Sequence, residues 1–314
     1  MLKIENLTLY TKNNKDTLYL LNDICFSLNK GDCLGIIGKT GDGKSTLAKA
    51  LLEIYDKNVY LEKGKIFFNN SLFSNDCRGK HISLVFQNPN SYLNPMMKVG
   101  KQIEEMLTFH FKQSKKVAKE KTLLMMKEVG IKNPDYTYSC YPHELSGGTQ
   151  QRICLCIALI CKPDVLILDE CTSFLDLESK NEIINLILKF QKEYKLTLIV
   201  ISHDFHEIYS LCNKIAIMRK GQIVEFGNID EVLSNPNHSY TIELLFDYFR
   251  YYKDISHFTC PLLKIELIKA PPINQITNTH YVRNWHSDKR AQKINFPNNF
   301  DILKEQIYEH ITNK

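Results

Sequence analysis

The sequence predicts an α/β protein whose central sheet is parallel and covered by helices on both faces. Two continuous apolar segments, residues 165–168 and 196–201, have the length of buried strands, and each precedes a helical pattern. A third apolar segment, residues 33–37, precedes a glycine-rich loop and a helix expected at about residues 44–54. Uninterrupted apolar strands that alternate with helices are typical of parallel sheets in α/β folds.

The elements before and between these strands follow in chain order. Alternating apolar residues such as Leu2 and Ile4 predict short strands near the amino terminus, with a polar turn at residues 12–16. From about residue 101 to 161 the pattern is helical. We therefore expect a helical part inserted into the sheet.

The carboxyl-terminal third of the chain loses this regularity. Helices are expected near residues 178–192 and from about Phe205, but past about Asn235 the periodicity fades. The tail mixes aromatic, proline and polar residues, as in Ala270-Pro271-Pro272. It is expected to form a separate appendage.

Composition narrows the class of protein. With 314 residues, 44% hydrophobic and 24% charged, the chain can bury at least one full core, which excludes a disordered protein. Apolar runs such as residues 153–161 are shorter than the roughly 18–20 residues of a membrane-spanning helix, and the amino terminus lacks a secretory signal pattern. We therefore expect a cytosolic protein. A net charge of +5 is too small to make nucleic acid the expected partner.

The ten cysteines lie mostly in apolar surroundings, and no Cys-x-x-Cys pair occurs. Cys25, Cys154 and Cys156 are examples, each next to large apolar residues. This pattern indicates buried, reduced thiols rather than a disulfide framework or a zinc site.

The segment after the strand at residues 33–37 has the pattern of a phosphate-binding loop. It reads Gly38-Lys39-Thr40-Gly41-Asp42-Gly43-Lys44-Ser45, and it has the strand and helix context that this pattern needs. Glycines let backbone N–H groups point at phosphate oxygens, Lys44 adds a cation, and Ser45 can ligate magnesium. The alternative is a glycine turn with a chance lysine. Nucleotide contacts are expected from Gly38, Thr40, Gly41, Asp42, Gly43, Lys44, Ser45 and Thr46.

Two acids, Asp169 and Glu170, follow the apolar strand at residues 165–168. Ligands of open α/β folds bind at the carboxyl ends of parallel strands. Asp169 is therefore expected to hold hydrated magnesium, and Glu170 to polarise the attacking water. Acids that merely cap a helix are the alternative.

A second motif combines a serine, two glycines and a following helix. Leu145-Ser146-Gly147-Gly148-Thr149-Gln150 would place Ser146 and the amides of Gly147 and Gly148 at a helix start, as a second anion site. A serine N-cap with a glycine hinge is the alternative. With this motif the sequence resembles the ATP-binding subunits of ABC transporters. The resemblance implies that this signature, including Gln150, binds the γ-phosphate of a nucleotide held by an opposing subunit, so that two subunits close over two ATP molecules.

Other positions match the same family. The resemblance implies that Gln87 senses magnesium and the attacking water and couples to the membrane subunit, and that His203 contacts the γ-phosphate. It implies that Asp176 crosses the dimer interface and that Tyr10, or alternatively Tyr19, stacks on adenine. Taken alone, each could be a surface polar residue, a capping or hydrogen-bonded histidine, or a core tyrosine.

The sequence resembles one branch of this family, the oligopeptide, dipeptide and nickel importers. The resemblance implies two different ATPase subunits beneath two membrane permeases, which a substrate-binding protein supplies. Residues 168–177 are more similar to the second ATPase subunit, and slightly more to nickel than to peptide systems. The motifs that carry this are Phe86-Gln87-Asn88-Pro89, Leu93-Asn94-Pro95, Val99-Gly100-Lys101-Gln102, Tyr141-Pro142-His143-Glu144-Leu145, Met218-Arg219-Lys220-Gly221-Gln222-Ile223-Val224-Glu225 and Pro236-Asn237-His238-Ser239-Tyr240-Thr241.

These observations predict an ABC-type ATP-binding domain at residues 1–250, with a parallel RecA-like sheet, an amino-terminal antiparallel β part and a helical subdomain at about 88–155. Residues 251–314 are predicted to be an extension. The expected function is ATP hydrolysis, with ATP and Mg²⁺, for uptake of peptides or a transition metal such as nickel. The protein would lie peripherally at the cytoplasmic face of the inner membrane and pair with a homologous subunit rather than a copy of itself. The alternative is a soluble ABC ATPase acting on ribosomes or DNA.

The sequence departs from the family pattern at several positions. Asp42 stands where a small residue is usual, so its carboxylate should repel phosphates, unless it faces outward and pairs with a neighbour such as Lys39. Cys171 and Phe174 replace a proline and an alanine, which affects the expected loop geometry. The tail lacks the cysteines that this branch often carries, and a weak metal-site case rests on Cys260, His257, His280 and His286.

Overall fold

The structure of the chain is a computed structural model, which describes residues 1–13, 16–253, 273–275 and 279–283. These residues fall into two compact units. Unit 1 holds Met1–Leu28, Asp32–Leu72 and the described residues from Val200 onward, and unit 2 holds Asn29–Gly31 and Phe73–Ile199. Parallel strand pairs occur in both units together with α-helices, so the predicted α/β fold is confirmed.

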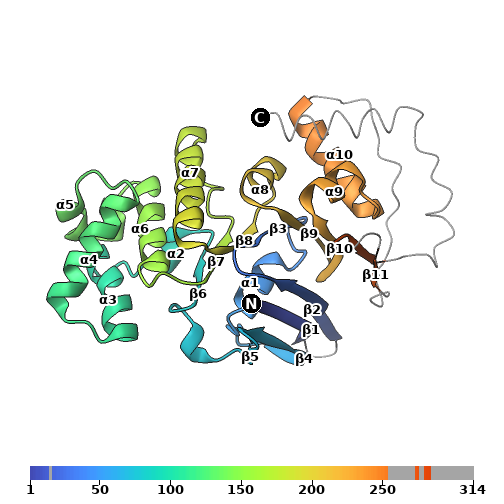
Figure 1. Cartoon of the computed structure of the whole chain (residues 1–314), viewed down its shortest axis with the longest axis horizontal. Coiled ribbons are helices and arrows are strands. Elements are labelled where there is room, and N and C mark those ends of the chain that lie inside the picture. Colours follow the sequence, from blue (N-terminus) through green and yellow to red (C-terminus); the bar gives the residue numbers. More distant parts are fainter. Residues whose placement is uncertain (14–15, 254–272, 276–278, 284–314) are drawn as a thin grey trace. The chain divides into compact units, whose positions relative to one another are not determined.

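An antiparallel sheet begins unit 1, as the alternating sequence predicts. Its strands are hydrogen-bonded in the order β2-β1-β4-β5 (Figure 1). Leu2 and Ile4 on β1 are buried whereas Lys3 between them is exposed, which is the period of two expected for a half-buried strand. The strands are β1 (Leu2–Asn13), β2 (Asp16–Leu28), β4 (Val59–Phe68) and β5 (Ser71–Leu72).

The second sheet of unit 1 has strands in the order β11-β12-β10-β9-β3. β3 and β9 pair in parallel, whereas β9, β10, β12 and β11 form antiparallel neighbours. Every residue of β3 is buried, as its apolar sequence predicts. The elements are β3 (Cys33–Ile37), α1 (Lys44–Ala50), α8 (Phe205–Leu211), β9 (Lys214–Arg219), β10 (Gln222–Asn228), α9 (Ile229–Ser234), α10 (Ser239–Lys253), β11 (Ile273–Gln275) and β12 (Tyr281–Arg283).

A buried carboxylate joins the carboxyl-terminal elements of unit 1. Glu225 on β10 is 1% exposed and accepts hydrogen bonds from the backbone N–H groups of Asn237 (2.8 Å) and His238 (3.0 Å). Thr241 Oγ1 donates to the same carboxylate, and His280 Nε2 lies 2.7 Å from Glu225 Oε1. A buried charge is tolerated where such partners surround it. The cluster therefore fastens β10, the start of α10 and the residue before β12 to one another.

Strand β12 alters the expected division at residue 250. Tyr281 and Val282 pair with β10, and Arg283 Nε donates to the carbonyl oxygen of Ile223 at 2.9 Å. Residues 281–283 are therefore part of the sheet of unit 1 and not of a separate appendage. The division stays a prediction for the residues outside the described ranges.

The metal site considered for the tail falls mostly outside the described residues. Cys260, His257 and His286 lie there, whereas His280 is engaged by Glu225. Among the residues that the structure describes, no group of three or more His, Cys, Asp or Glu side chains is placed to hold a metal ion.

Two truncations test the contribution of β12 to stability. A chain that ends after Lys253 lacks His280 and Arg283, so the Glu225 carboxylate loses one of its hydrogen-bonding partners and β10 loses its pairing with β12. We expect the free energy of unfolding to fall by at least about 1–3 kcal/mol. A chain that ends after Arg283 keeps these contacts and should unfold like the full chain. Urea unfolding followed by circular dichroism measures both, and equal midpoints for the two truncations would contradict the expectation.

The stability of unit 1 should also depend on pH through His238. Burial, together with the nearby Arg219 guanidinium, lowers the pKa of His238 from its ordinary 6.5 to about 3. Between these values the unfolded chain binds a proton that the folded chain does not, so stability is complete above pH 6.5 and is lost as pH falls toward 3. At a pH one unit below 6.5 the loss is about 1.4 kcal/mol.

The variant His238→Gln isolates this effect because glutamine does not titrate. The drop in the urea midpoint between about pH 7.5 and pH 5.5 should be smaller for the variant than for the wild type. Comparing the two drops removes contributions from other titrating groups. An identical drop in both proteins would rule out His238 as the source.

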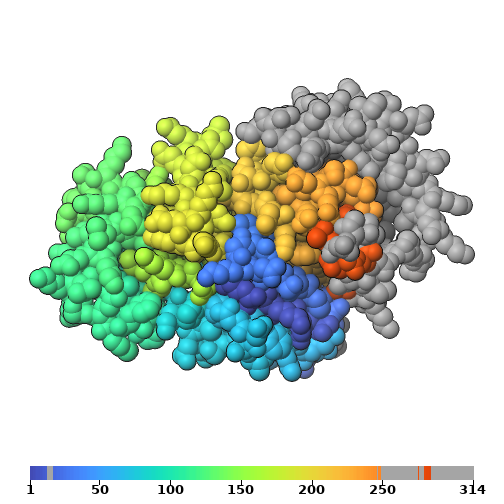
Figure 2. All heavy atoms as spheres, in the orientation of Figure 1, coloured from blue at the N-terminus to red at the C-terminus, as the bar shows by residue number. Residues whose placement is uncertain are grey.

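Unit 2 combines a parallel strand pair with the predicted helical part. Its strands follow the order β8-β7-β6, with β6 and β7 parallel. In the space-filling view the green residues of this part of the chain form one packed body (Figure 2). The elements are η1 (Asn75–Cys77), β6 (Ile82–Val85), α2 (Pro89–Tyr92), α3 (Val99–Phe111), α4 (Lys115–Glu128), α5 (Pro134–Tyr138), η2 (Pro142–Glu144), α6 (Gly147–Leu159), β7 (Val165–Asp169), α7 (Leu177–Tyr194) and β8 (Thr197–Ile201), whose last residues belong to unit 1.

Composition predicted that the chain has no membrane-spanning helix and that its cysteines are buried, reduced thiols. None of the described helices has both the length and the apolar character needed to span a bilayer. The nine cysteines in the described ranges are all free thiols, and only Cys25 and Cys77 among them are not buried. The predicted pattern of buried, reduced thiols is confirmed for these residues.

Candidate nucleotide site

The phosphate loop connects β3 to α1 and depends on two glycines. Gly41 and Gly43 have φ angles of 90° and 92°, in the left-handed region that glycine tolerates best. A Cβ on Gly43 would also lie 2.7 Å from the carbonyl oxygen of Leu20. Thr40 and Ser45 are exposed, so their side of the loop is open to a ligand.

Lys44 lies inside the loop. Its side chain is buried, and Nζ donates to the carbonyl oxygens of Gly38 (2.8 Å) and Lys39 (3.1 Å). These contacts hold the ammonium group at the loop, where charge-assisted hydrogen bonds to phosphate can form. Thr46, also expected to contact nucleotide, is half-buried in the first turn of α1.

Asp42 is buried, and its carboxylate does not pair with the Lys39 ammonium, so the outward-facing alternative is wrong. Its side chain is 7% exposed, so it does not face outward. The carboxylate accepts hydrogen bonds from the backbone N–H of Lys39 (2.7 Å), the hydroxyl of Tyr240 (2.6 Å) and the backbone N–H of Lys220 (2.9 Å). The Lys39 ammonium instead pairs with Glu243 at 2.6 Å. Asp42 is therefore a buried acceptor for groups of its own chain.

The expected catalytic residues of unit 2 meet at the carboxyl ends of two neighbouring parallel strands. Gln87 follows β6, Asp169 is the last residue of β7, and Glu170 comes next with a left-handed φ of 47°. Gln87 Nε2 donates to Glu170 Oε2 at 2.6 Å, and Ser173 Oγ approaches the same oxygen at 3.4 Å. Asp169 is 4% exposed, whereas Glu170 is half-buried. The structure therefore brings Gln87 and Glu170 together.

The signature segment starts helix α6. Ser146 is the N-cap residue, and its hydroxyl lies 3.0 Å from that of Thr149. A Cβ on Gly147 would meet no atom within 4 Å, and one on Gly148 would meet only Ser179 Oγ at 3.8 Å. Gly147 and Gly148 thus leave the helix start open. Ser146 caps the helix, and this arrangement is compatible with an anion site at the same helix start.

Gln150 and Asp176, two predicted site residues, form hydrogen bonds at the starts of α6 and α7. Gln150 is 7% exposed, and its Nε2 donates to the carbonyl oxygens of Pro142 (2.9 Å) and Leu145 (3.2 Å), which fixes the turn before α6. Asp176 caps α7 by accepting from Ser179 N at 2.9 Å. Hydrogen bonds from the backbone and side chain of Ser179 lower the pKa of Asp176, so it stays ionised.

His203 lies between β8 and α8 in unit 1. Its side chain is exposed. The alternative of a helix-capping histidine is wrong, because Asp204 caps α8 by accepting from His206 N at 2.9 Å. Ser202 Oγ is used by Glu207 at 3.0 Å. His203 therefore lies at the surface, after a strand of the sheet, as its expected contact with nucleotide requires.

Tyr10 is part of a row of three tyrosines across the antiparallel sheet. Tyr19 on β2 and Tyr60 on β4 are its direct cross-strand partners. The ring centroids lie 6.4 Å apart for Tyr10 and Tyr19, and 5.6 Å apart for the stacked pair of Tyr10 and Tyr60. Both expected adenine-stacking candidates therefore belong to one aromatic surface.

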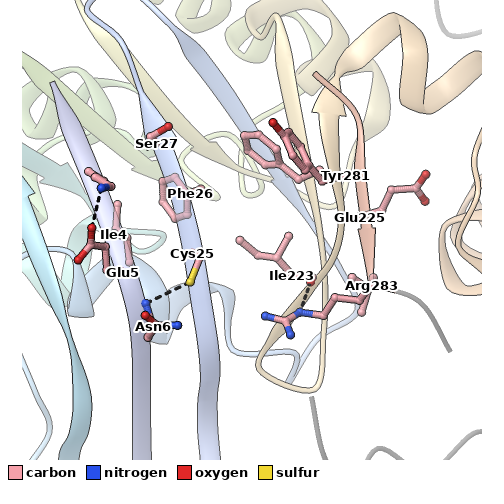
Figure 3. Close-up of a pocket in the computed structure, with 13 residues that line it drawn as sticks. Ile4, Glu5, Asn6, Cys25, Phe26, Ser27, Ile223, Glu225, Tyr281 and Arg283 are labelled. Atoms are coloured by element: carbon pink, nitrogen blue, oxygen red, sulfur yellow. Dashed lines mark hydrogen bonds and ion pairs between the residues drawn. The ribbon is translucent and has the colours of Figure 1, made fainter. Parts of the chain in front are cut away.

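A cavity of about 470 Å³ lies in unit 1, and none of the predicted site residues lines it. Strands β1 and β2 contribute residues such as Ile4 and Phe26 on one side, and β10 and β12 contribute Ile223 and Tyr281 on the other (Figure 3). Arg283 at its wall is engaged by Asp23. The lining is mostly apolar, and nothing in it resembles a phosphate site.

Sequence reasoning missed Tyr60, Tyr240 and Lys220. Tyr60 reaches Tyr10 only through the pairing of β1 with β4, a register that no local pattern encodes. Tyr240 and Lys220 lie 198 and 178 residues from Asp42 along the chain. The one available signal was Asp42 itself, since a carboxylate in a glycine-rich loop needs partners.

Comparison with known proteins supports the likeness to ATP-binding subunits. Residues 21–173 match the family described as ABC transporter. The oligopeptide transport ATP-binding protein OppD of Bacillus subtilis is 32% identical over 328 residues, which cover 95% of this chain and 92% of that protein. The dipeptide transport ATP-binding protein DppD of Lactococcus lactis is 31% identical, and the match covers 94% and 93%.

Solved structures with the same fold include the dimeric post-hydrolysis state of the ATP-binding cassette MJ0796 bound to ADP and Pi. Its TM-score is 0.66 at 24% identity, covering 73% of this chain and 99% of that one. The structure of cbiO1 from Clostridium perfringens, part of the ABC transporter complex cbiONQ, has a TM-score of 0.62 at 26% identity, covering 81% and 98%.

Proposed function

The chain belongs to the ATP-binding subunits of ABC transporters and is an ATPase, and we propose that it energises uptake of peptides through partner permeases. The relatives named above transport oligopeptides and dipeptides. They favour peptides over a transition metal such as nickel, and they favour an importer over a soluble ATPase that acts on ribosomes or DNA. We infer a peripheral position at the cytoplasmic face of the cell membrane.

The contact between Gln87 and Glu170 is the observation that carries the catalytic assignment. We assign Glu170 as the general base, because its carboxylate can accept a proton from the water that attacks the terminal phosphate. The 2.6 Å hydrogen bond from Gln87 Nε2 orients that carboxylate. Gln87 lies between β6 and α2, and we propose that it also couples the base to a permease. His203 is assigned to the γ-phosphate.

The side chains expected to hold magnesium have the chemistry that this ion requires. The Ser45 hydroxyl, the Asp169 carboxylate and the Gln87 amide oxygen would each supply a hard oxygen ligand of the kind that magnesium prefers. Because Gln87 uses its Nε2 to contact Glu170, its amide oxygen is the atom left to face a metal. Magnesium supplies charge neutralisation on the phosphate oxygens. Lys44 and the loop amides bind the phosphates by themselves, through charge and N–H donation.

The signature is assigned to a nucleotide held by a second subunit. Ser146 and the open backbone at Gly147 and Gly148 start a helix of 13 residues, whose amino terminus attracts anions. Asp176 lies in the neighbouring loop, where Phe174 is 73% exposed. A homologous ATPase subunit is the partner proposed for this surface, with two permeases and, indirectly, a substrate-binding protein.

Reconstitution tests the proposal. The chain should be co-purified with a homologous ATPase subunit and two permeases, placed in liposomes and supplied with the substrate-binding protein. We expect ATP hydrolysis to rise when that protein carries a peptide, and labelled peptide to enter the liposomes. Stimulation by nickel instead would correct the substrate. Stimulation of the isolated chain by ribosomes or DNA, with no peptide response, would overturn the importer assignment.

A further inference from the structure

Helix α10 reaches the phosphate loop through the hydroxyl of Tyr240. This hydroxyl donates to Asp42 Oδ2 at 2.6 Å and accepts from the backbone N–H of Lys39 at 3.1 Å. The same Lys39 N–H also donates to Asp42 Oδ2 at 2.7 Å. The three groups therefore form a closed set of hydrogen bonds, which we name the loop clasp, between the start of the loop, its Asp42 side chain and α10.

A second set of bonds holds the other oxygen of Asp42. The backbone N–H of Lys220, in the turn between β9 and β10, donates to Oδ1 at 2.9 Å. Gly221 N donates to the Asp42 carbonyl oxygen at 2.9 Å. Both carboxylate oxygens thus face donors of the protein. The carboxylate thus already accepts three hydrogen bonds, two at Oδ2 and one at Oδ1, so most of its acceptor capacity is taken up within the protein.

The high pKa of the Tyr240 phenol and the charges around it stabilise the loop clasp. Burial, followed by the hydrogen bond to Asp42, raises the pKa of the Tyr240 phenol, so the hydroxyl keeps the proton it donates. The Arg219 guanidinium lies 4.7 Å from the centre of the Tyr240 ring and holds the ring in place. The Lys39 ammonium binds Glu243 (2.6 Å) and Asp247 on α10 (2.9 Å), which draws the loop to the same helix.

We propose that Tyr240 is a positioning residue for nucleotide binding, which keeps the Asp42 carboxylate turned into the loop and away from the phosphates. The proposal rests on the assignment of residues 38–46 as the ATP site. Asp42 stands between two left-handed glycines, so the backbone alone restrains it weakly. Without the hydroxyl, the carboxylate can rotate toward the ligand, where it repels phosphate charge and takes up loop amides.

The variant Tyr240→Phe tests this, because it removes the hydroxyl and keeps the ring. We expect the affinity for magnesium-ATP to fall about tenfold, which corresponds to about 1.4 kcal/mol. KM should rise while kcat changes little, since the catalytic groups are untouched. The defect should shrink at high salt, which screens repulsion, and adenosine binding should be unaffected because adenosine has no phosphate.

Tyr209→Phe is the matched control, since it also removes a hydrogen bond from a tyrosine to an aspartate, here Asp230 at 3.3 Å. Its affinity for magnesium-ATP should match that of the wild type.

A double-mutant cycle with Asp42→Ser separates this role from general loosening of the fold. In the Asp42→Ser background, Tyr240→Phe should change affinity less than twofold, because the carboxylate is gone. Asp42→Ser alone should bind magnesium-ATP no more tightly than the wild type, in contrast to the tenfold gain that simple repulsion predicts. The titration of Asp42→Ser keeps the proposal open to refutation even if Tyr240→Phe folds poorly, because a tenfold gain in affinity would overturn it.

The outcomes are distinct. Unchanged affinity in Tyr240→Phe, an equal defect in both backgrounds, or a tenfold gain in Asp42→Ser would overturn the clasp. If the wild type itself does not bind ATP, the proposed function fails instead. Binding by the wild type that is lost on Lys44→Ala, together with a normal Tyr240→Phe, would leave the proposed function intact and remove only this inference.

Discussion

Replacing Glu170 with glutamine should lower the rate of ATP hydrolysis by about 10²–10⁴-fold while nucleotide still binds. The loss of a positioned general base has this effect because the attacking water must then give up its proton unaided. The amide oxygen of the new side chain can still accept the hydrogen bond from Gln87, now 2.6 Å long, so the local geometry should persist. Nucleotide that is bound but not hydrolysed should hold two subunits together.

Phosphate release measures the rate, and size-exclusion chromatography with ATP measures association, ideally on the assembled complex. Glu120→Gln is a suitable control, because Glu120 is an exposed glutamate on α4 outside the site. It should behave as the wild type. Full turnover by Glu170→Gln would show that another group serves as the base.

Replacing Lys44 with alanine should remove most nucleotide binding and therefore hydrolysis. Hydrogen bonds from a charged donor contribute about 1.5–3 kcal/mol each, so affinity should fall by about 10–100-fold. The loss also frees the carbonyl oxygens of Gly38 and Lys39 that Nζ now contacts, which loosens the loop.

Titration with a fluorescent ATP analogue measures the Lys44 effect. Lys49→Ala offers a control on the same helix, since Lys49 Nζ pairs with Asp56 at 3.1 Å. Its affinity should match that of the wild type. An unchanged affinity in Lys44→Ala would refute the assignment of the phosphate loop.

The sequence predicted those parts of the site that local patterns encode. The loop, the strand before it and the acids after β7 follow from short-range rules: apolar runs form buried strands, and their ends carry the polar groups. The meeting of Gln87 with Glu170 also agrees with those rules, because each follows a strand and the two strands are neighbours. Such reasoning fixes where a residue lies along an element.

It does not fix which distant groups a side chain contacts. Asp42 was expected either to repel phosphate or to face solvent, and the donor that decides its orientation lies on a helix far along the chain. The hydrogen bonds that Gln150 donates to the turn before α6 were likewise not foreseen, and its contact with nucleotide stays a prediction. Strand β12 escaped detection because three residues carry no periodic signal, and its place depends on pairing with β10.

The burial of the cysteines has a consequence for covalent chemistry. Burial raises the pKa of Cys154 to about 12 and that of Cys161 to about 11, so almost no thiolate exists there at neutral pH. Only the thiolate attacks alkylating reagents and mild oxidants. Among the described cysteines only Cys25 and Cys77 are not buried, and partial burial raises the pKa of Cys25, so alkylation within the described ranges should be confined largely to Cys77. Thiol-directed dyes can therefore be attached at newly introduced cysteines once Cys77 is replaced, provided that Cys260, which lies outside the described residues, is replaced as well.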